Sequence, residues 1–209
     1  MAYAPAGSDA STIRAMQEKA RLRKQVRVLR DAAPVDARAR WSARICERAV
    51  SHPAYTRART VHVFLSFQSE IDTRAIVLHA LAGGKRVVVP VFLSRSEETP
   101  ATQIETLDDA AYDIGSWGMR VPKVRRDVPI DEIDLVFVPT LCWSQVGIGR
   151  YARVGYGAGY YDRLLACLRP DVPRIGLAFE LQRVEALPVE LHDQLIDEVL
   201  TETIFATDN

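Results

Sequence analysis

The most informative segment of the chain reads GYGAGYYDR and spans residues 155–163. Three glycines alternate with other residues and are followed by two tyrosines, an aspartate, an arginine and the apolar run 164–168. Upstream, residues 133–139 read IDLVFVP, which is typical of a buried strand because the run is short, contains β-branched residues and ends at a proline. The predicted order is therefore a strand, an irregular connection, a glycine-rich loop and a helix.

The glycine-rich loop has two interpretations. Glycines allow backbone N–H groups to approach an anion closely, and the following helix directs its free N–H groups and its positive dipole end to the same place. Asp162 falls in the predicted first turn, where it can cap N–H groups or hold a cation, and Arg153 lies two residues before the first glycine. The segment matches neither the P-loop pattern nor G-x-G-x-x-G. A phosphate site and a plain turn covered by tyrosines are both open.

The composition predicts one globular domain. The 209 residues are 48% hydrophobic and 26% charged, and the 27 basic and 27 acidic residues cancel, so the overall charge favours no partner. The distribution is uneven, because residues 14–48 hold 11 Lys and Arg with 4 Asp and Glu, whereas residues 180–209 hold 1 Arg with 8 Asp and Glu. Three interpretations of this distribution are open. The two regions could attract each other, they could together flank a site for a magnesium-bound anion, or they could form two solvated faces.

Cysteine usage and the amino-terminal residues predict the compartment. The three cysteines, Cys46, Cys142 and Cys167, are far apart and form no C-x-x-C or Cys/His cluster, so we expect free thiols in a reducing environment. Residues 1–9 lack the features of a signal peptide, and no apolar stretch reaches membrane-spanning length. We therefore expect a soluble cytoplasmic protein without a membrane partner.

The periodicity predicts an α/β fold. Residues 1–11 are expected to form a disordered tail, and residues 12–209 a single α/β domain. A basic N-terminal helical pair is predicted at 12–30 and 35–51, followed by strands and helices in alternation. Strands are predicted at 61–67, 85–93, 103–107, 133–139, 174–179 and 198–203, with a helix at 73–82, a polar loop at 94–100 and little pattern elsewhere in 101–120. This order gives a three-layer, largely parallel sheet with helices on both faces.

The same topology predicts where a ligand binds. In open parallel sheets, ligands collect at the carboxyl ends of the strands. Glu70, the glycine-rich loop and Asp193 all fall at or after such ends, so one crevice is expected to hold them together.

Four segments, in this order, resemble those of the 5-formyltetrahydrofolate cyclo-ligases, also called methenyltetrahydrofolate synthetases. KARLR at 19–23 is similar to the family's K-x-x-L-R, and FLS at 64–66 with EIDT at 70–73 is similar to its first strand and turn. RVGYGAGYYDR at 153–163 is similar to its R-L-G-x-G-x-G-Y-Y-D signature. HD at 192–193 with DEV at 197–199 and TE at 201–202 is similar to its carboxyl end. The resemblance extends nearly from end to end of the chain.

The resemblance implies an ATP- and Mg²⁺-dependent ring closure of 5-formyltetrahydrofolate to 5,10-methenyltetrahydrofolate, with ADP and phosphate released after the formyl oxygen is phosphorylated. It assigns ATP binding to Lys19, Arg23, Arg153, Val154, Gly155, Tyr156, Gly157, Ala158, Gly159, Tyr160 and Tyr161. It assigns folate binding to Leu65, Glu70, Tyr156, Gly157, Ala158, Gly159 and Tyr160. It assigns Mg²⁺ to Asp162 and Asp193. The implied partners are small molecules rather than nucleic acid, and we expect a monomer.

Each of these residues also has a structural interpretation. Lys19 could be one more solvated helix lysine, Glu70 could cap the helix beginning near residue 73, residues 192–193 could form a surface turn, and Tyr160 and Tyr161 could belong to the core.

Two alternative functions stay open. The family enters its signature through P-G-x-x-F-D-x-x-G-x-R, whereas residues 139–144 read PTLCWS, without that glycine and aspartate, and the stretch 145–152 is longer than usual. These departures support a diverged paralogue that binds nucleotide or folate without efficient turnover. The basic helices support, more weakly, a nucleic-acid-binding protein on an α/β scaffold.

Overall fold

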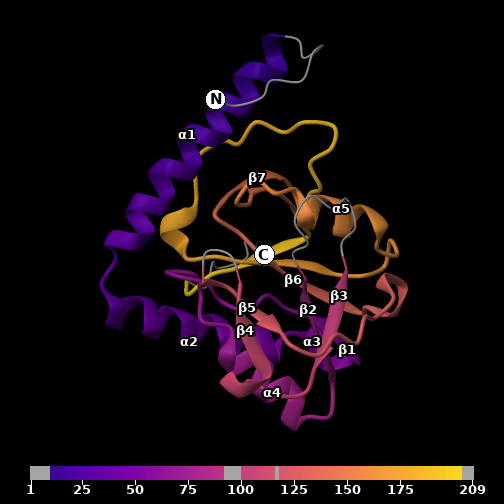
Figure 1. Ribbon diagram of the computed structural model, residues 1–209. Helices are drawn as coiled ribbons and strands as arrows, with labels where there is room; N and C mark the ends of the chain where they lie inside the picture. Colours follow the sequence, from indigo (N-terminus) through magenta and orange to yellow (C-terminus); the bar gives the residue numbers. More distant parts are fainter. Residues whose placement is uncertain (1–9, 92–99, 116–117, 204–209) are drawn as a thin grey trace.

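A six-stranded sheet in the order β10-β9-β6-β1-β2-β3 forms the centre of the molecule (Figure 1). The computed structural model describes residues 10–91, 100–115 and 118–203. The sheet strands are β1 (Thr60–His62), β2 (Arg86–Pro90), β3 (Ala101–Ile104), β6 (Leu135–Pro139), β9 (Arg174–Leu177) and β10 (Glu198–Leu200). All neighbouring strands pair in parallel except β2 and β3, which pair antiparallel. The predicted, largely parallel sheet is confirmed.

Helices cover both faces of this sheet. The helices are α1 (Ala10–Ala32), α2 (Val35–Ser51), α3 (Pro53–Arg57), α4 (Arg74–Ala82) and α5 (Tyr160–Cys167), with short 3-10 helices η1 (Asp109–Ala111), η3 (Ile130–Glu132) and η4 (Glu180–Gln182). Strand residues alternate between the faces, because successive side chains of a strand point in opposite directions. Leu135 and Phe137 join the core under α2, α3 and α4, whereas Val136 and Val138 join the core under α5. The predicted three layers are thereby confirmed.

The connection before the glycine-rich loop differs from the prediction. It is an antiparallel hairpin of β7 (Cys142–Gly147) and β8 (Arg150–Val154), not an irregular segment. A glycine at its tip, Gly149, has a φ of +61°, which lets the chain reverse within a short loop. Residues 112–122 likewise hold a ribbon of β4 (Tyr112–Ile114) and β5 (Arg120–Pro122) where little pattern was found.

Other boundaries also differ, most of all for β1, which ends at His62, five residues before the predicted end at 67. Helix α1 begins at Ala10, two residues before the expected start, and α3 was not predicted. The predicted strand at 103–107 is β3, which begins and ends earlier. The rest of the expected tail and most of the expected loop at 94–100 lie outside the described residues. Within the described part of the chain, no helix is long and apolar enough to cross a membrane.

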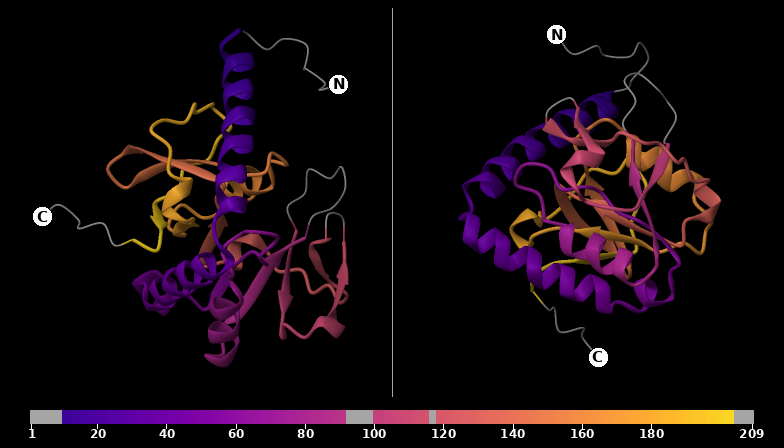
Figure 2. Two further views of the ribbon diagram at one scale, coloured as in Figure 1. Left: turned by 90° about the vertical axis from the view of Figure 1, so that its left-hand side faces the viewer. Right: turned by 60° about the horizontal axis from the view of Figure 1, so that its bottom comes forward.

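Helix α1 packs on the hairpin rather than on the central sheet. Its Leu22 and Val26 are buried against Leu141, Cys142 and neighbouring hairpin residues, and Figure 2 shows the helix standing beside the hairpin. The arrangement places the basic face of α1 along the glycine-rich loop that follows the hairpin.

Candidate active site

The glycine-rich loop joins β8 to α5 in a backbone conformation that favours glycine. Gly157 has a φ of +101°, and Gly159, the residue before the first turn of α5, has a φ of +68°. A side chain on Gly159 would bring its Cβ to 2.8 Å from an Arg163 nitrogen, and one on Gly157 to 3.6 Å from the Arg23 guanidinium carbon. The loop therefore presents bare backbone to the basic face of α1, next to the free N–H groups at the start of α5.

Helix α1 supplies a row of cations along this loop. Lys19, Arg23, Arg27 and Arg30 are spaced by four, four and three positions, which places them on one face of a helix. The Arg23 Nε donates to the Gly155 carbonyl oxygen at 2.8 Å, and the Arg27 guanidinium lies 5.5 Å from the centre of the Tyr156 ring. The sequence analysis found the first two of these cations and missed Arg27 and Arg30, although their helical spacing was a usable signal.

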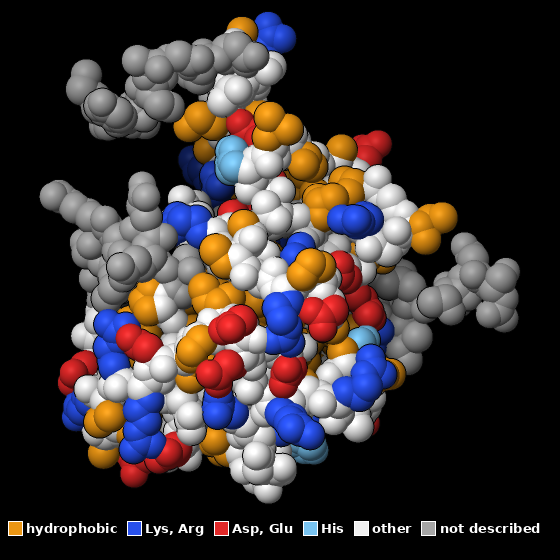
Figure 3. Space-filling model, turned by 90° about the vertical axis from the view of Figure 1, so that its right-hand side faces the viewer, with side chains coloured by type: hydrophobic (Ala, Val, Ile, Leu, Met, Phe, Trp, Pro, Cys, Tyr) orange, Lys and Arg blue, Asp and Glu red, His pale blue; other side chains and the backbone are white. Residues whose placement is uncertain are grey.

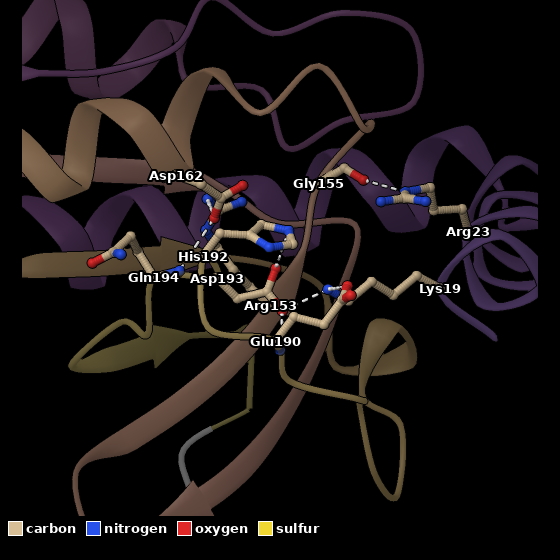
Figure 4. A network of polar contacts seen from close by, with 9 residues as sticks. All are labelled: Lys19, Arg23, Arg153, Gly155, Asp162, Glu190, His192, Asp193 and Gln194. Atoms are coloured by element: carbon tan, nitrogen blue, oxygen red, sulfur yellow. Dashed lines mark hydrogen bonds and ion pairs between the residues drawn. The ribbon is translucent and has the colours of Figure 1, made fainter. Parts of the chain in front are cut away.

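Lys19 lies between two carboxylates. Its side chain is buried, and its Nζ lies 2.8 Å from Glu190 Oε2 and 2.5 Å from Asp193 Oδ2 (Figure 4). The same Asp193 oxygen accepts the Glu190 backbone N–H at 2.7 Å. The interpretation of Lys19 as a solvated lysine is therefore wrong, and the basic and acidic regions of the chain do attract each other here. Glu190 was missed by the sequence analysis; its only signal was an acidic side chain three positions before Asp193.

Arg153 holds the second carboxylate of the site. Its Nη2 donates to Asp162 Oδ1 at 2.8 Å, and the Gln194 backbone N–H reaches the same oxygen at 3.3 Å. Burial lowers the pKa of Arg153, and the charges of Asp162 and Asp193 act in the opposite direction. Both aspartates therefore face one buried guanidinium (Figure 4).

The carboxylates fit a hard divalent cation. Ligand atoms of Glu190, His192 and Asp193 lie within 4.8 Å of one another, and carboxylate oxygens are the ligands that Mg²⁺ prefers. Asp162 is not part of this group and reaches the site through Arg153. In this structure the acidic groups are paired with protein cations, Lys19 with Glu190 and Asp193, and Arg153 with Asp162.

Glu70 lies in the turn that follows β1. Its Oε2 accepts the Phe67 backbone N–H at 2.9 Å, while Gln68 has a φ of +54°. The first N–H of helix α4, that of Arg74, donates to the Asp72 carboxylate at 3.0 Å and not to Glu70, so the interpretation of Glu70 as a helix cap is wrong. Burial raises the pKa of the Glu70 carboxyl, whereas a hydrogen bond from Tyr156 and the charge of Arg30 lower it. Tyr156 thus connects Glu70 to the glycine-rich loop.

Several assigned residues turn their side chains into the core. Val154, Tyr160 and Tyr161 are buried, and the Tyr160 hydroxyl donates to the Pro100 carbonyl oxygen at 2.9 Å. Leu65 is half-buried against the core under α4. The core interpretation of the two tyrosine side chains is confirmed, so any contact of Val154 or Tyr161 with a ligand would come from the backbone. Their assignment to ATP stays a prediction.

The fold and the site together define a class of α/β proteins in which a glycine-rich loop opens a helix and faces a row of cations beside paired carboxylates. Comparison with known proteins identifies the group within that class. The model of the 5-formyltetrahydrofolate cyclo-ligase family matches residues 15–202. Two similar proteins are the 5-formyltetrahydrofolate cyclo-ligase of Mus musculus, 28% identical over 88% of this chain and 91% of its own, and that of Escherichia coli K12, 31% identical over 74% and 84%.

Solved structures agree with these matches. The NMR structure of Aquifex aeolicus 5,10-methenyltetrahydrofolate synthetase superposes with a TM-score of 0.74 at 25% identity, covering 89% of this chain and 90% of that one. The Mycoplasma pneumoniae 5,10-methenyltetrahydrofolate synthetase superposes with a TM-score of 0.69 at 20% identity, covering 88% and 99%, and supports the fold alone. The chain belongs to the 5-formyltetrahydrofolate cyclo-ligase family of enzymes.

Proposed function

We propose that the protein converts 5-formyltetrahydrofolate to 5,10-methenyltetrahydrofolate in a reaction that consumes ATP and requires Mg²⁺. The observation that carries the proposal is that three cations from two distant parts of the chain gather at the glycine-rich loop and its carboxylates. Arg23 contacts Gly155 of the loop, Arg153 contacts Asp162, and Lys19 contacts Asp193. A phosphate group with a bound metal ion suits this site, because the basic side chains can pair with the phosphate and the carboxylates with the ion.

The cations and the loop are assigned to the phosphates of ATP. The Arg23 guanidinium lies close to the backbone of Gly157, which has no side chain to keep it away. The start of α5 directs free N–H groups to the same region. The resemblance assigns Mg²⁺ to Asp162 and Asp193; in the structure Glu190 lies beside Asp193, and Asp162 is joined to Arg153. When bound, the ion neutralises phosphate charge and polarises the transferring group. Lys19, which contacts Glu190 and Asp193 in this structure, would be the cation closest to a phosphate held beside these carboxylates.

The chemistry requires little covalent work from the protein. The formyl oxygen attacks the γ-phosphorus, and the bond from that phosphorus to ADP breaks. The N10 nitrogen then attacks the activated carbon and loses its proton, the carbon–oxygen bond breaks, and phosphate leaves. Alignment and charge neutralisation are the main contributions of a phosphoryl-transfer site. Glu70, at the end of β1, is assigned to hydrogen-bond donors of the folate ring, and Leu65 to its apolar part.

The test is to follow the near-ultraviolet absorbance of methenyltetrahydrofolate in mixtures of the protein, 5-formyltetrahydrofolate, ATP and Mg²⁺. We expect a rise that needs all components and disappears with EDTA. Asp162→Asn and Lys19→Met should each lower the rate by roughly 100-fold, the usual cost of one charge-stabilising group. Lys24→Met is the matched control, because Lys24 is an exposed lysine of the same helix. A folded Asp162→Asn variant with the wild-type rate would refute the magnesium assignment.

The paralogue alternative has a distinct outcome. The departures from the family fall in the β7–β8 hairpin, whose tip carries the fully exposed Ile148. Protein that binds ATP but produces no methenyltetrahydrofolate would favour the paralogue and direct attention to this hairpin.

The nucleic-acid alternative finds less support. Lys19, Arg23 and Arg30 of the basic helix α1 are turned to the site. The face drawn in Figure 3 mixes basic and acidic side chains among the described residues.

A further inference from the structure

Arg30 is a buried cation beside the site that is assigned to none of ATP, folate or Mg²⁺. It lies in the last turn of α1 and is only 2% exposed. Its Nε donates to the Ser69 Oγ at 3.0 Å, and its Nη2 donates to the Tyr156 hydroxyl oxygen at 2.9 Å. Ser69 in turn donates to an Asp31 carboxylate oxygen. Removing a guanidinium from water is costly, so these hydrogen bonds indicate that a definite geometry is maintained here.

Tyr156 links this cation to Glu70. Its hydroxyl oxygen accepts from Arg30 at 2.9 Å, and the same hydroxyl group opposes the rise in the pKa of Glu70 that burial causes. A hydroxyl group that accepts from a cation becomes a stronger donor, because hydrogen bonds in a chain polarise one another. Tyr156 as a whole residue is 38% exposed, although its hydroxyl group is engaged by Arg30.

The Glu70 carboxylate is therefore held by two groups. One oxygen accepts the Phe67 backbone N–H, and the Tyr156 hydroxyl supports the charged form. We propose that Arg30 is a positioning residue, which holds Glu70 ionised and oriented through the hydroxyl of Tyr156. An ionised carboxylate accepts two parallel hydrogen bonds from N–H donors. The role of Glu70 toward the folate rests on the proposed function, whereas the chain from Arg30 to Glu70 is a property of the protein alone.

Other charges near Glu70 are few among the described residues. The titratable and charged groups that face it are Arg30 of α1, Tyr156 of the glycine-rich loop and Tyr161 of α5. The remaining interpretation is that Arg30 only stabilises the carboxyl end of α1, as a cation in a last helical turn does. That role would alter the free energy of unfolding without altering the titration of Glu70.

A titration of Glu70 in the ligand-free protein separates the two roles. Side-chain carboxyl groups of glutamate labelled with carbon-13 are followed by NMR against pH, and Glu70→Gln assigns the Glu70 resonance. We expect Tyr156→Phe and Arg30→Met to raise the titration midpoint by about one pH unit, the size of one lost hydrogen bond to a charged group. Tyr156→Phe keeps the ring and removes only the hydroxyl, so it tests the chain even where Arg30→Met fails to fold.

Arg27→Met is the matched control. Arg27 is an exposed arginine on the same face of α1, and its guanidinium lies 5.5 Å from the centre of the Tyr156 ring, whereas the Tyr156 hydroxyl accepts from Arg30. We expect its midpoint to stay at the wild-type value. An unchanged midpoint in Tyr156→Phe, or an equal shift in Arg27→Met and Arg30→Met, would overturn the proposal.

A kinetic measurement connects the chain to turnover. The sign follows from the need for an ionised Glu70, since binding is lost as the pH falls through its pKa. In Tyr156→Phe the acid limb of kcat/KM for 5-formyltetrahydrofolate should therefore move up by about one pH unit, whatever the change in kcat/KM at the pH optimum. Inactive wild-type protein would refute the proposed function but leave the NMR result to decide the role of Arg30. Wild-type activity with an unmoved acid limb in Tyr156→Phe would refute the positioning role.

Discussion

Replacement of His62 by leucine should stabilise the protein and remove part of its sensitivity to acid. His62 lies in β1 at the middle of the sheet, fully buried, and neither ring nitrogen has a hydrogen-bond partner among the described residues. The rings of Tyr160 and Tyr161 lie 6.5 Å and 5.7 Å from it. Each unpaired buried polar group costs about 1–3 kcal/mol, so an apolar side chain of similar size removes this cost.

The effect of pH follows from linkage. Burial lowers the pKa of His62 from its ordinary value of 6.5 to about 3, so below pH 6.5 the unfolded chain binds a proton that the folded protein does not. The free energy of unfolding therefore carries no pH-dependent penalty from His62 above pH 6.5, and it decreases as the pH falls from 6.5 toward 3. The slope is about 1.4 kcal/mol per pH unit. At roughly pH 5 the loss is therefore about 2 kcal/mol relative to neutral pH.

The assay is urea unfolding at neutral pH and near pH 5, followed by tryptophan fluorescence, for the wild type and His62→Leu. Other groups titrate equally in both proteins, so the difference between them isolates His62. His192→Gln is the control, because its side chain is 72% exposed. We expect His62→Leu to be the more stable protein at both pH values, with an advantage about 2 kcal/mol larger near pH 5. A variant that is less stable and equally sensitive to acid would show that the ring of His62 makes an essential contact.

Two further predictions concern the loop and the thiols. Gly159→Ala and Gly84→Ala should each cost about 1–2 kcal/mol of stability, because both glycines have a positive φ, of +68° and +70°; only Gly159→Ala should also lower turnover, since Gly84 has open space around it away from the site. An equal loss of turnover in both variants would contradict a special role of the loop. The Cys46 and Cys142 thiols, whose pKa burial raises to about 11 and about 12, should resist a thiol reagent near neutral pH while the exposed Cys167 reacts. Titration with a chromogenic disulfide, with and without denaturant, checks this prediction, and rapid reaction of all thiols in the folded protein would contradict it.

The sequence predicted the parts of the fold whose signals are local. Helix α2 has the predicted bounds, because its apolar side chains recur at helical spacing between two prolines. The glycine-rich loop was also predicted from a local signal, since glycines stand at alternate positions before an apolar run. The hairpin of β7 and β8 was not predicted, because one of its faces packs on α1, and nothing in residues 142–154 indicates a partner so far away in the chain.

The candidate site shows the same division. Residues 153–163 were found directly, because the loop and its flanking charges are adjacent in sequence. The pairs of Lys19 with Glu190 and Asp193 join positions 171 and 174 residues apart, so no local pattern contains them. The resemblance to a family supplied Lys19 and Asp193, but neither Glu190 nor Arg30, whose importance depends on which neighbours the fold brings to them.

Helix α1 explains how the departures from the family pattern fit with an intact set of charges. The family's glycine and aspartate are replaced by Thr140 and Ser144, and the residues between them include Leu141 and Cys142, which are buried against α1. The altered stretch thus contributes apolar residues to the surface on which α1, the helix that carries Lys19, Arg23 and Arg30, packs. Because the glycine-rich loop and both aspartates lie outside these residues, the departures change how α1 is supported and leave the charged groups of α1 in place.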